Sequence, residues 1–221
     1  MVWCRTMKLL TYVRENSDQL IFLTEQHIEL VLISVLISAV IGIGTALLTT
    51  TTPRLRDGLL SFTGTLLTIP SFALFALMIP LFGLGVVPTI VALVIYGIFP
   101  ILRNTVTGIE SVDPAVIDAA RGLGMGPKRR MWSVILPLAW PVILNGIRTA
   151  SVMLVASAAI GAIVRGPGLG QLIFRGLERI GGANALEETL SGVIGVAVVA
   201  LVLDLLFVVI AKITTLRGLN V

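Results

Sequence analysis

Long apolar stretches, nearly free of ionisable side chains, are the feature that most limits how this 221-residue chain can fold. Each is long enough to cross the hydrocarbon core of a bilayer, which takes about 20 helical residues. With 56% of its residues hydrophobic and 13% charged, the chain is too apolar for a soluble fold. We therefore predict an all-α membrane protein with five transmembrane helices, at residues 28–50, 58–82, 86–108, 142–164 and 189–211.

The segments outside these stretches are short, so we expect one membrane domain, residues 28–212, and no second folded domain. Residues 1–27 precede the first span. Apolar residues recur at helical spacing beside charged ones from residue 9 to residue 29, which favours an extracytoplasmic helix lying along the membrane interface. We expect no cleavable signal peptide, because the first strongly apolar segment starts near residue 28 and is too long.

The positions of basic residues predict the orientation. The loops 51–57 and 109–140 and the end of the chain, residues 212–221, share one side of the membrane and are rich in lysine and arginine. The other side also carries basic residues, but fewer of them lie close to span ends. By the positive-inside rule we expect the N-terminus outside and the tail, residues 213–221, in the cytoplasm of a bacterial-type cell.

Composition also argues against several classes of site. The net charge of +4 comes from residues that flank spans, which indicates contact with lipid headgroups rather than nucleic acid. A single cysteine, Cys4, excludes an internal disulfide, and a single histidine, His27, is expected at the membrane interface. We predict no catalytic residue, no metal site and no cofactor.

The loop 109–140 is the most informative segment. Asp113 and Pro114 are typical of a helix start, with a capping carboxylate and a proline in the first turn. The glycines at 122, 124 and 126 should end that helix. Pro127 can open a second helix, residues 128–136, which we expect to stop near Pro137, before the fourth span. We predict a helix–turn–helix hairpin that docks on another protein; the alternative is a loop that merely joins two spans.

The hairpin residues carry a resemblance. An acid, two alanines, a glycine four residues later and an aliphatic-x-Leu-Pro ending resemble the EAA motif of binding-protein-dependent ABC importer permeases. Asp118 stands where that family usually has glutamate, and Val134 where it usually has isoleucine. The residues that the resemblance assigns to ATPase coupling are Asp118, Ala119, Ala120, Gly124, Met125, Gly126, Leu136 and Pro137.

Other segments look like permeases for osmoprotectants such as glycine betaine, choline and carnitine. They are residues 68–71, 100–105, 146–150, 166–170 and 173–177. The resemblance implies the methionine-importer type of permease fold, with a cytoplasmic coupling helix. It also implies separate ABC ATPase subunits, a second permease subunit, identical or not, and an extracytoplasmic solute-binding protein. No lysine follows a glycine here, so the chain has no P-loop and the ATPase must be another chain.

Some residues inside the spans are candidates for the transport pathway. They are Pro70, Ser71, Arg103, Asn104, Arg148 and Asp204. Ordinary helix packing is the alternative for most of them. Arg148 and Asp204 lie at similar depth, so we predict that they pair; alternatively, Arg148 meets a substrate carboxylate.

The main prediction is therefore a transporter subunit without an ATPase site of its own. The alternatives are a permease for another small solute, such as an amino acid, and a stand-alone secondary transporter. The latter would normally show an inverted repeat or coupling acids near the midplane.

Overall fold

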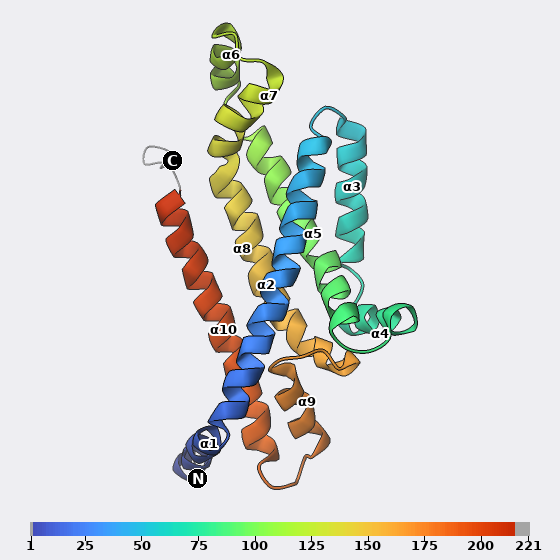
Figure 1. The fold of residues 1–221 in the computed structure, drawn as a ribbon, viewed down its shortest axis with the longest axis vertical. Coiled ribbons are helices and arrows are strands. Elements are labelled where there is room, and N and C mark those ends of the chain that lie inside the picture. The colour runs from blue at the N-terminus through green and yellow to red at the C-terminus, as the bar shows by residue number, and fades with distance from the viewer. Residues whose placement is uncertain (1, 215–221) are drawn as a thin grey trace.

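A computed structural model describes residues 2–214, with side chains from residue 8 onward, and shows a bundle of long helices (Figure 1). Four helices in this part of the chain are long and apolar enough to cross a membrane, and a bent pair raises the number of spans to five. The four are α2 (Ser17–Leu48), α5 (Val86–Glu110), α10 (Ala185–Thr214) and the helix Pro127–Val164. The predicted all-α membrane fold is confirmed.

The bent pair occupies the predicted second span. Instead of one helix over 58–82, α3 (Pro53–Leu66) and α4 (Ser71–Phe82) meet at 97°. Pro70 has no amide to donate and disfavours a helical residue before it, so α3 ends ahead of it. Tyr96 on α5 donates its hydroxyl to the Ile69 carbonyl at 2.6 Å and so satisfies an acceptor at the break. The predicted second span is thus a pair of helices that meet at Pro70 rather than one straight helix.

The N-terminal boundary also differs from the prediction. A break at Asn16 separates α1 (Val2–Glu15) from α2, so residues 17–27 belong to the first long helix rather than to a separate interfacial helix. The Asn16 side-chain amide donates to the Tyr12 carbonyl at 2.9 Å, which helps to end α1. His27 therefore lies inside α2 and is fully buried, with Nε2 3.1 Å from the Val155 carbonyl oxygen. We expected it at the interface.

The helix that contains the predicted fourth span begins earlier than that span. The expected stop at Pro137 is absent, because α7 (Pro127–Arg130), a π turn (Met131–Ile135) and α8 (Leu136–Ile160) form one helix, closed by a 3-10 turn (Gly161–Val164). In the π turn the Leu136 amide bonds to the Met131 carbonyl, five residues back. This wider turn lies just before Pro137, whose missing amide would otherwise interrupt α-helical bonding.

Helix α5 is the centre of the bundle. It packs most extensively against α8 and α2, and it also contacts α3 and α4. Gly97 of α5 lies directly against α2 and α8: an added Cβ would overlap Ser38 Oγ and lie 3.1 Å from Leu154 Cδ1. Gly146 of α8 is equally tight, since a Cβ there would lie 2.6 Å from Asn104 Cβ. Close approach at small residues is the usual way in which helices associate in lipid.

Opposite the hairpin, α9 (Gly170–Glu178) folds back between α8 and α10 and packs closely on α10. A Cβ on Gly192 of α10 would lie 2.7 Å from Ile173 of α9. We call this region, with α1, the N-terminal end of the bundle, and the opposite region the hairpin end (Figure 1).

The close approach at Gly97 gives a first prediction. Gly97→Ala should lower the free energy of unfolding by about 1–3 kcal/mol, because the new methyl group overpacks the contact with Ser38. Gly44→Ala in α2 is the matched control: no atom lies within 4 Å of its added Cβ, and alanine favours the helix. Detergent-denaturation curves of the purified protein measure both. Equal effects of the two substitutions would contradict the proposed packing.

Candidate functional site

The hairpin projects beyond the ends of the other helices (Figure 1). Its first arm is α6 (Pro114–Gly122). The Asp113 carboxylate caps this arm by accepting from the Ala115 amide at 2.8 Å, and Pro114 occupies the first turn. The second arm is α7, which Pro127 opens. The predicted helix–turn–helix is confirmed, except that its second arm continues without a break into α8.

The turn between the arms explains the spacing of the motif. The Met125 amide bonds to the Ala120 carbonyl at 3.1 Å, and the Gly124 amide bonds to the Arg121 carbonyl at 2.9 Å. These two bonds define a Schellman motif, which requires a residue of positive φ four positions after the first acceptor. Gly124, with φ +77°, is that residue, and the buried Ala120 is the acceptor. The motif keeps an alanine and a glycine four residues apart because one helix cap needs both: the alanine carbonyl accepts a hydrogen bond, and the glycine adopts the positive φ.

The tip of the hairpin exposes small and apolar groups. Leu123 is 79% exposed, and Ala119 beside it is also exposed. Asp118 forms an exposed ion pair with Arg121 at 3.2 Å, which adds little stability. Leu123 is the most exposed large apolar side chain of the hairpin within the described residues.

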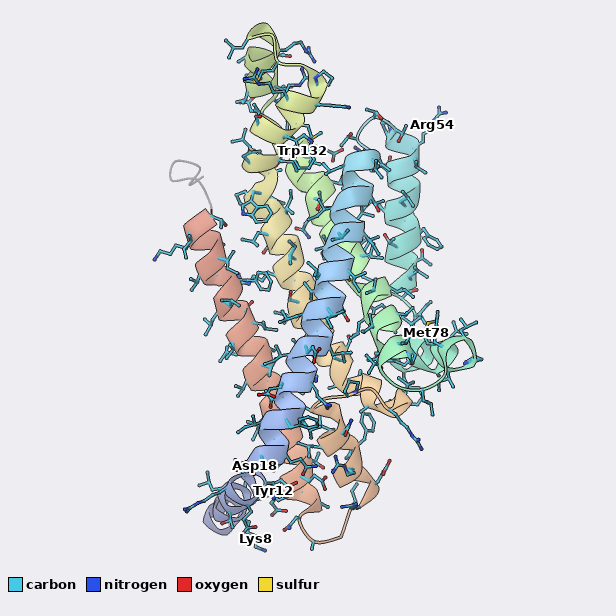
Figure 2. The ribbon with its side chains drawn as sticks, in the orientation of Figure 1. Lys8, Tyr12, Asp18, Arg54, Met78 and Trp132 are labelled. Atoms are coloured by element: carbon cyan, nitrogen blue, oxygen red, sulfur yellow. The ribbon has the colours of Figure 1, made fainter. Side chains whose placement is uncertain are left out.

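The last two residues of the motif do not lie at the tip of the hairpin. Leu136 and Pro137 line an apolar recess of about 350 Å³ between α2 and the α7–α8 helix, together with Trp132, Trp140 and Leu47. Figure 2 places Trp132 at the base of the projecting hairpin. The motif therefore divides into a turn at the tip and a segment that joins the hairpin to the bundle.

A groove with several polar side chains in its walls runs between α3 and α5. Its cavity measures about 640 Å³, and its walls include Gly64, Thr65, Thr68, Phe99, Arg103 and Glu110. The Phe99 ring packs on Gly64, where an added Cβ would lie 3.0 Å from it. The guanidinium carbon of Arg103 lies 5.8 Å from the centre of that ring. At the hairpin end Glu110 pairs with Arg56. We call this feature the α3–α5 groove.

Arg148 of α8 and Asp204 of α10 form the predicted pair. Arg148 Nε and one terminal nitrogen donate to the two carboxylate oxygens of Asp204, at 2.6 Å and 2.7 Å. Such a two-point contact fixes both side chains and neutralises both charges within the apolar segments. The guanidinium is thus engaged, which argues against the alternative in which Arg148 meets a substrate carboxylate.

Similarity to known proteins identifies the family of this chain. Residues 30–215 match the family model described as binding-protein-dependent transport system inner membrane component. The chain belongs to this family. It is 38% identical over 219 residues to the osmoprotectant import permease protein OsmW of Salmonella typhimurium (strain LT2), covering 97% of this chain and 100% of that protein.

Two further comparisons agree with this family. The chain is 32% identical over 213 residues to the glycine betaine/carnitine/choline transport system permease protein OpuCB of Bacillus subtilis (strain 168), covering 96% of each. The fold is similar to an inward-facing structure of the MetNI methionine ABC transporter, with a TM-score of 0.78, 21% identity, and coverage of 89% of this chain and 96% of that one. The predicted methionine-importer type of permease fold is confirmed, in a multi-pass membrane protein.

The six intramembrane residues that we predict as pathway candidates lie at different places in the fold. Pro70 and Ser71 lie at the bend between α3 and α4. Asn104 donates to the Pro100 carbonyl at 2.8 Å and packs on Gly146, so it belongs to the α5–α8 contact. Of the six candidates, Arg103 lines the α3–α5 groove, and Arg148 and Asp204 meet each other.

Several groove residues were missed at the level of sequence. They are Ser61 and Thr65 on α3, and Phe99, Thr107 and Glu110 on α5; Thr68, in the turn after α3, belongs to segment 68–71, which the sequence did single out. A signal was available, because the polar residues of each set recur every three or four positions along an otherwise apolar helix and thus share one face.

The Schellman turn gives a second prediction. Gly124→Ala should open the turn, since an alanine at positive φ costs about 1–2 kcal/mol, and trypsin should cleave after Arg121 roughly 5- to 30-fold faster. Gly122→Ala is the matched control, because Gly122 lies in α6 with no atom near its added Cβ. Gly124→Asn should fall between the two. Equal cleavage of both alanine variants would contradict the assigned turn.

The Arg148–Asp204 pair gives a third prediction. Arg148→Met should lower the thermal midpoint of the purified protein, because it leaves Asp204 unpaired in an apolar segment. The double variant Arg148→Met with Asp204→Leu should regain most of the loss, since no lone charge remains. Melting curves of the single and double variants complete the cycle. Strictly additive losses would argue against the pairing as a source of stability.

Proposed function

We propose that this chain is the permease subunit of an ATP-driven importer for osmoprotectants of the quaternary ammonium class, such as glycine betaine, carnitine and choline. One observation carries the coupling role: the residues of the EAA motif build the capped turn of a hairpin that projects from a membrane bundle. The solute class follows the names of the full-length relatives. These favour this function over an amino-acid importer or a stand-alone transporter.

The hairpin is proposed to dock on a separate ATPase subunit, since this chain has no P-loop. Leu123 and Ala119 form the exposed contact, and the Schellman turn keeps them in place. The helix from Pro127 to Val164 then carries a displacement of the tip into the span that packs on α5. A stiff helix of this kind moves as a rigid body, so it transmits the motion without refolding.

The orientation follows from the basic residues. Arg54 and Arg56 at the start of α3, and Arg121 and the basic residues of α7, all lie at the hairpin end (Figures 1 and 2). We propose that this end is cytoplasmic and that the N-terminus is outside, as the positive-inside rule requires.

The α3–α5 groove is proposed to line the inner half of the transport pathway, with Pro70 and Ser71 near the bend at its far end. Exposed polar side chains at membrane depth are not stable against lipid, so they require water or another protein. A second permease subunit, identical or not, would cover this face and complete the pathway, while the remaining apolar surface contacts lipid.

The N-terminal end is proposed to receive an extracytoplasmic solute-binding protein. Glu188 of α10 is only 7% exposed and lies 3.7 Å from Arg175 of α9 and 4.0 Å from Arg179, the residue that follows α9. Burial of Tyr12, and the nearby Glu188 carboxylate, raise the pKa of its phenol above the ordinary value, so Tyr12 stays neutral. This cluster ties α1, α9 and α10 into one platform.

Docking of the ATPase gives a fourth prediction. Leu123→Asp should lower the amount of ATPase subunit that co-purifies by about tenfold or more, because a charge replaces the exposed apolar contact. Leu123→Met, which keeps an apolar side chain of similar volume, is the matched control and should bind normally. Quantified subunit ratios after detergent extraction measure both. Normal ATPase recovery with the aspartate variant would argue against the hairpin as the docking element.

A further inference from the structure

Arg103 is an intramembrane charge that the fold leaves without a counter-ion. Within residues 8–214 the structure shows no ion pair and no hydrogen bond for its guanidinium, and its described neighbour is the Phe99 ring at 5.8 Å. It lies seven residues from the end of α5, about 10 Å deep by the helical rise. An unpaired cation at such depth is costly and is usually retained for a function.

The cavity beside Arg103 is open and large enough for a small solute. Its volume of about 640 Å³ lies within the range of ordinary ligand sites, about 300–1,000 Å³. The Phe99 ring, seated on Gly64, lies 5.8 Å from the guanidinium carbon, within the range of a cation–π contact. Such a contact engages no N–H group, so the donors of the guanidinium stay available for a planar anion.

Partial negative charge comes from hydroxyl oxygens of α3 and of the turn that follows it. The Thr65 hydroxyl donates to the Ser61 carbonyl at 2.8 Å, and the Thr68 hydroxyl donates to the Thr65 carbonyl at 2.7 Å. Their protons are thus engaged, and the oxygens keep lone pairs on the wall of the same cavity. The groove combines a donor-only cation with electron-rich oxygens, which suits a zwitterion better than a simple cation.

We propose that Arg103 binds the carboxylate of the solute as it passes through the α3–α5 groove. A guanidinium binds a carboxylate through two parallel hydrogen bonds, while a quaternary ammonium group, which has no N–H, is attracted to the threonine oxygens. This inference rests on the proposed function. It makes Arg103 a specificity residue: glycine betaine and carnitine carry a carboxylate, whereas choline carries a neutral hydroxyl and is repelled by the guanidinium.

The test uses the complete complex of permease, ATPase and solute-binding protein in proteoliposomes. Uptake of labelled glycine betaine and labelled choline is measured for the unaltered complex and for Arg103→Gln and Arg103→Lys. Arg54→Gln is the matched control, because Arg54 is an exposed arginine at the start of α3 that does not line the groove. ATP hydrolysis stimulated by the loaded binding protein is recorded in the same vesicles.

We expect Arg103→Gln to lower glycine betaine uptake by about 10- to 100-fold, the usual effect of losing hydrogen bonds to a charged group. Choline uptake should stay within about twofold or rise, and stimulated ATP hydrolysis should persist. Arg103→Lys, which keeps the charge and loses the two-point geometry, should show a smaller loss. Arg54→Gln should change neither uptake.

Other outcomes contradict the assignment. An equal loss of both solutes, a parallel loss of ATP hydrolysis, no loss at all, or failure of Arg103→Gln to assemble would show that Arg103 acts in structure or contacts lipid headgroups. Uptake of choline alone by the unaltered complex would overturn the role of Arg103 and leave the proposed function intact. Uptake of no quaternary ammonium solute would overturn the proposed function itself, and the carboxylate assignment with it.

Discussion

The close approach of α5 to α2 and α8 is the contact on which the rest of the structure depends. At Gly97 and Gly146 no side chain fits between the helices, so one face of α5 is fixed against its neighbours. Helical periodicity then turns Phe99, Arg103 and Glu110 toward α3, on a different face of the same helix. One helix thus holds the bundle together and also presents the polar side chains of the groove.

The second constraint is that backbone polar groups must be satisfied inside the protein. In the hairpin this is done by the Asp113 carboxylate at one end of α6 and by the Schellman bonds around Gly124 at the other. At the membrane entrance the π turn carries the helix past Pro137, and at the bend the Tyr96 hydroxyl binds the Ile69 carbonyl. Each irregularity therefore has a specific hydrogen bond, which makes the connection from tip to bundle stiff.

Features that depend on local chemistry were predictable from the sequence. The spans 86–108 and 189–211 agree with α5 and α10 because apolar runs of that length have one stable form in lipid. The cap at Asp113 and the turn at Gly124 follow from single residues with strong backbone preferences. The Arg148–Asp204 pair was predictable from depth, since the cost of a lone charge favours pairing.

Features that depend on contacts between distant segments were not predictable in the same way. Pro70 indicates a break, but the angle of 97° and the hydroxyl from α5 come from tertiary packing. Helical continuity past Pro137 requires a π turn that no local preference signals, and the burial of His27 depends on α8. The depth of an arginine in the membrane also could not predict whether it pairs, because pairing depends on which face of its helix the arginine occupies. Arg148 faces Asp204, whereas Arg103 faces a cavity.

The position of this cavity connects the two ends of the proposed mechanism. The hairpin continues into α8, α8 packs on α5 through glycines, and α5 carries Arg103 into the groove shared with α3. In the proposed mechanism a displacement of the tip moves α8 and the closely packed α5 together, and so shifts α5 against α3, which it contacts less extensively. The proposed mechanism therefore changes the shape of the groove, and an unpaired guanidinium is tolerable there only if water or a solute replaces its missing counter-ion.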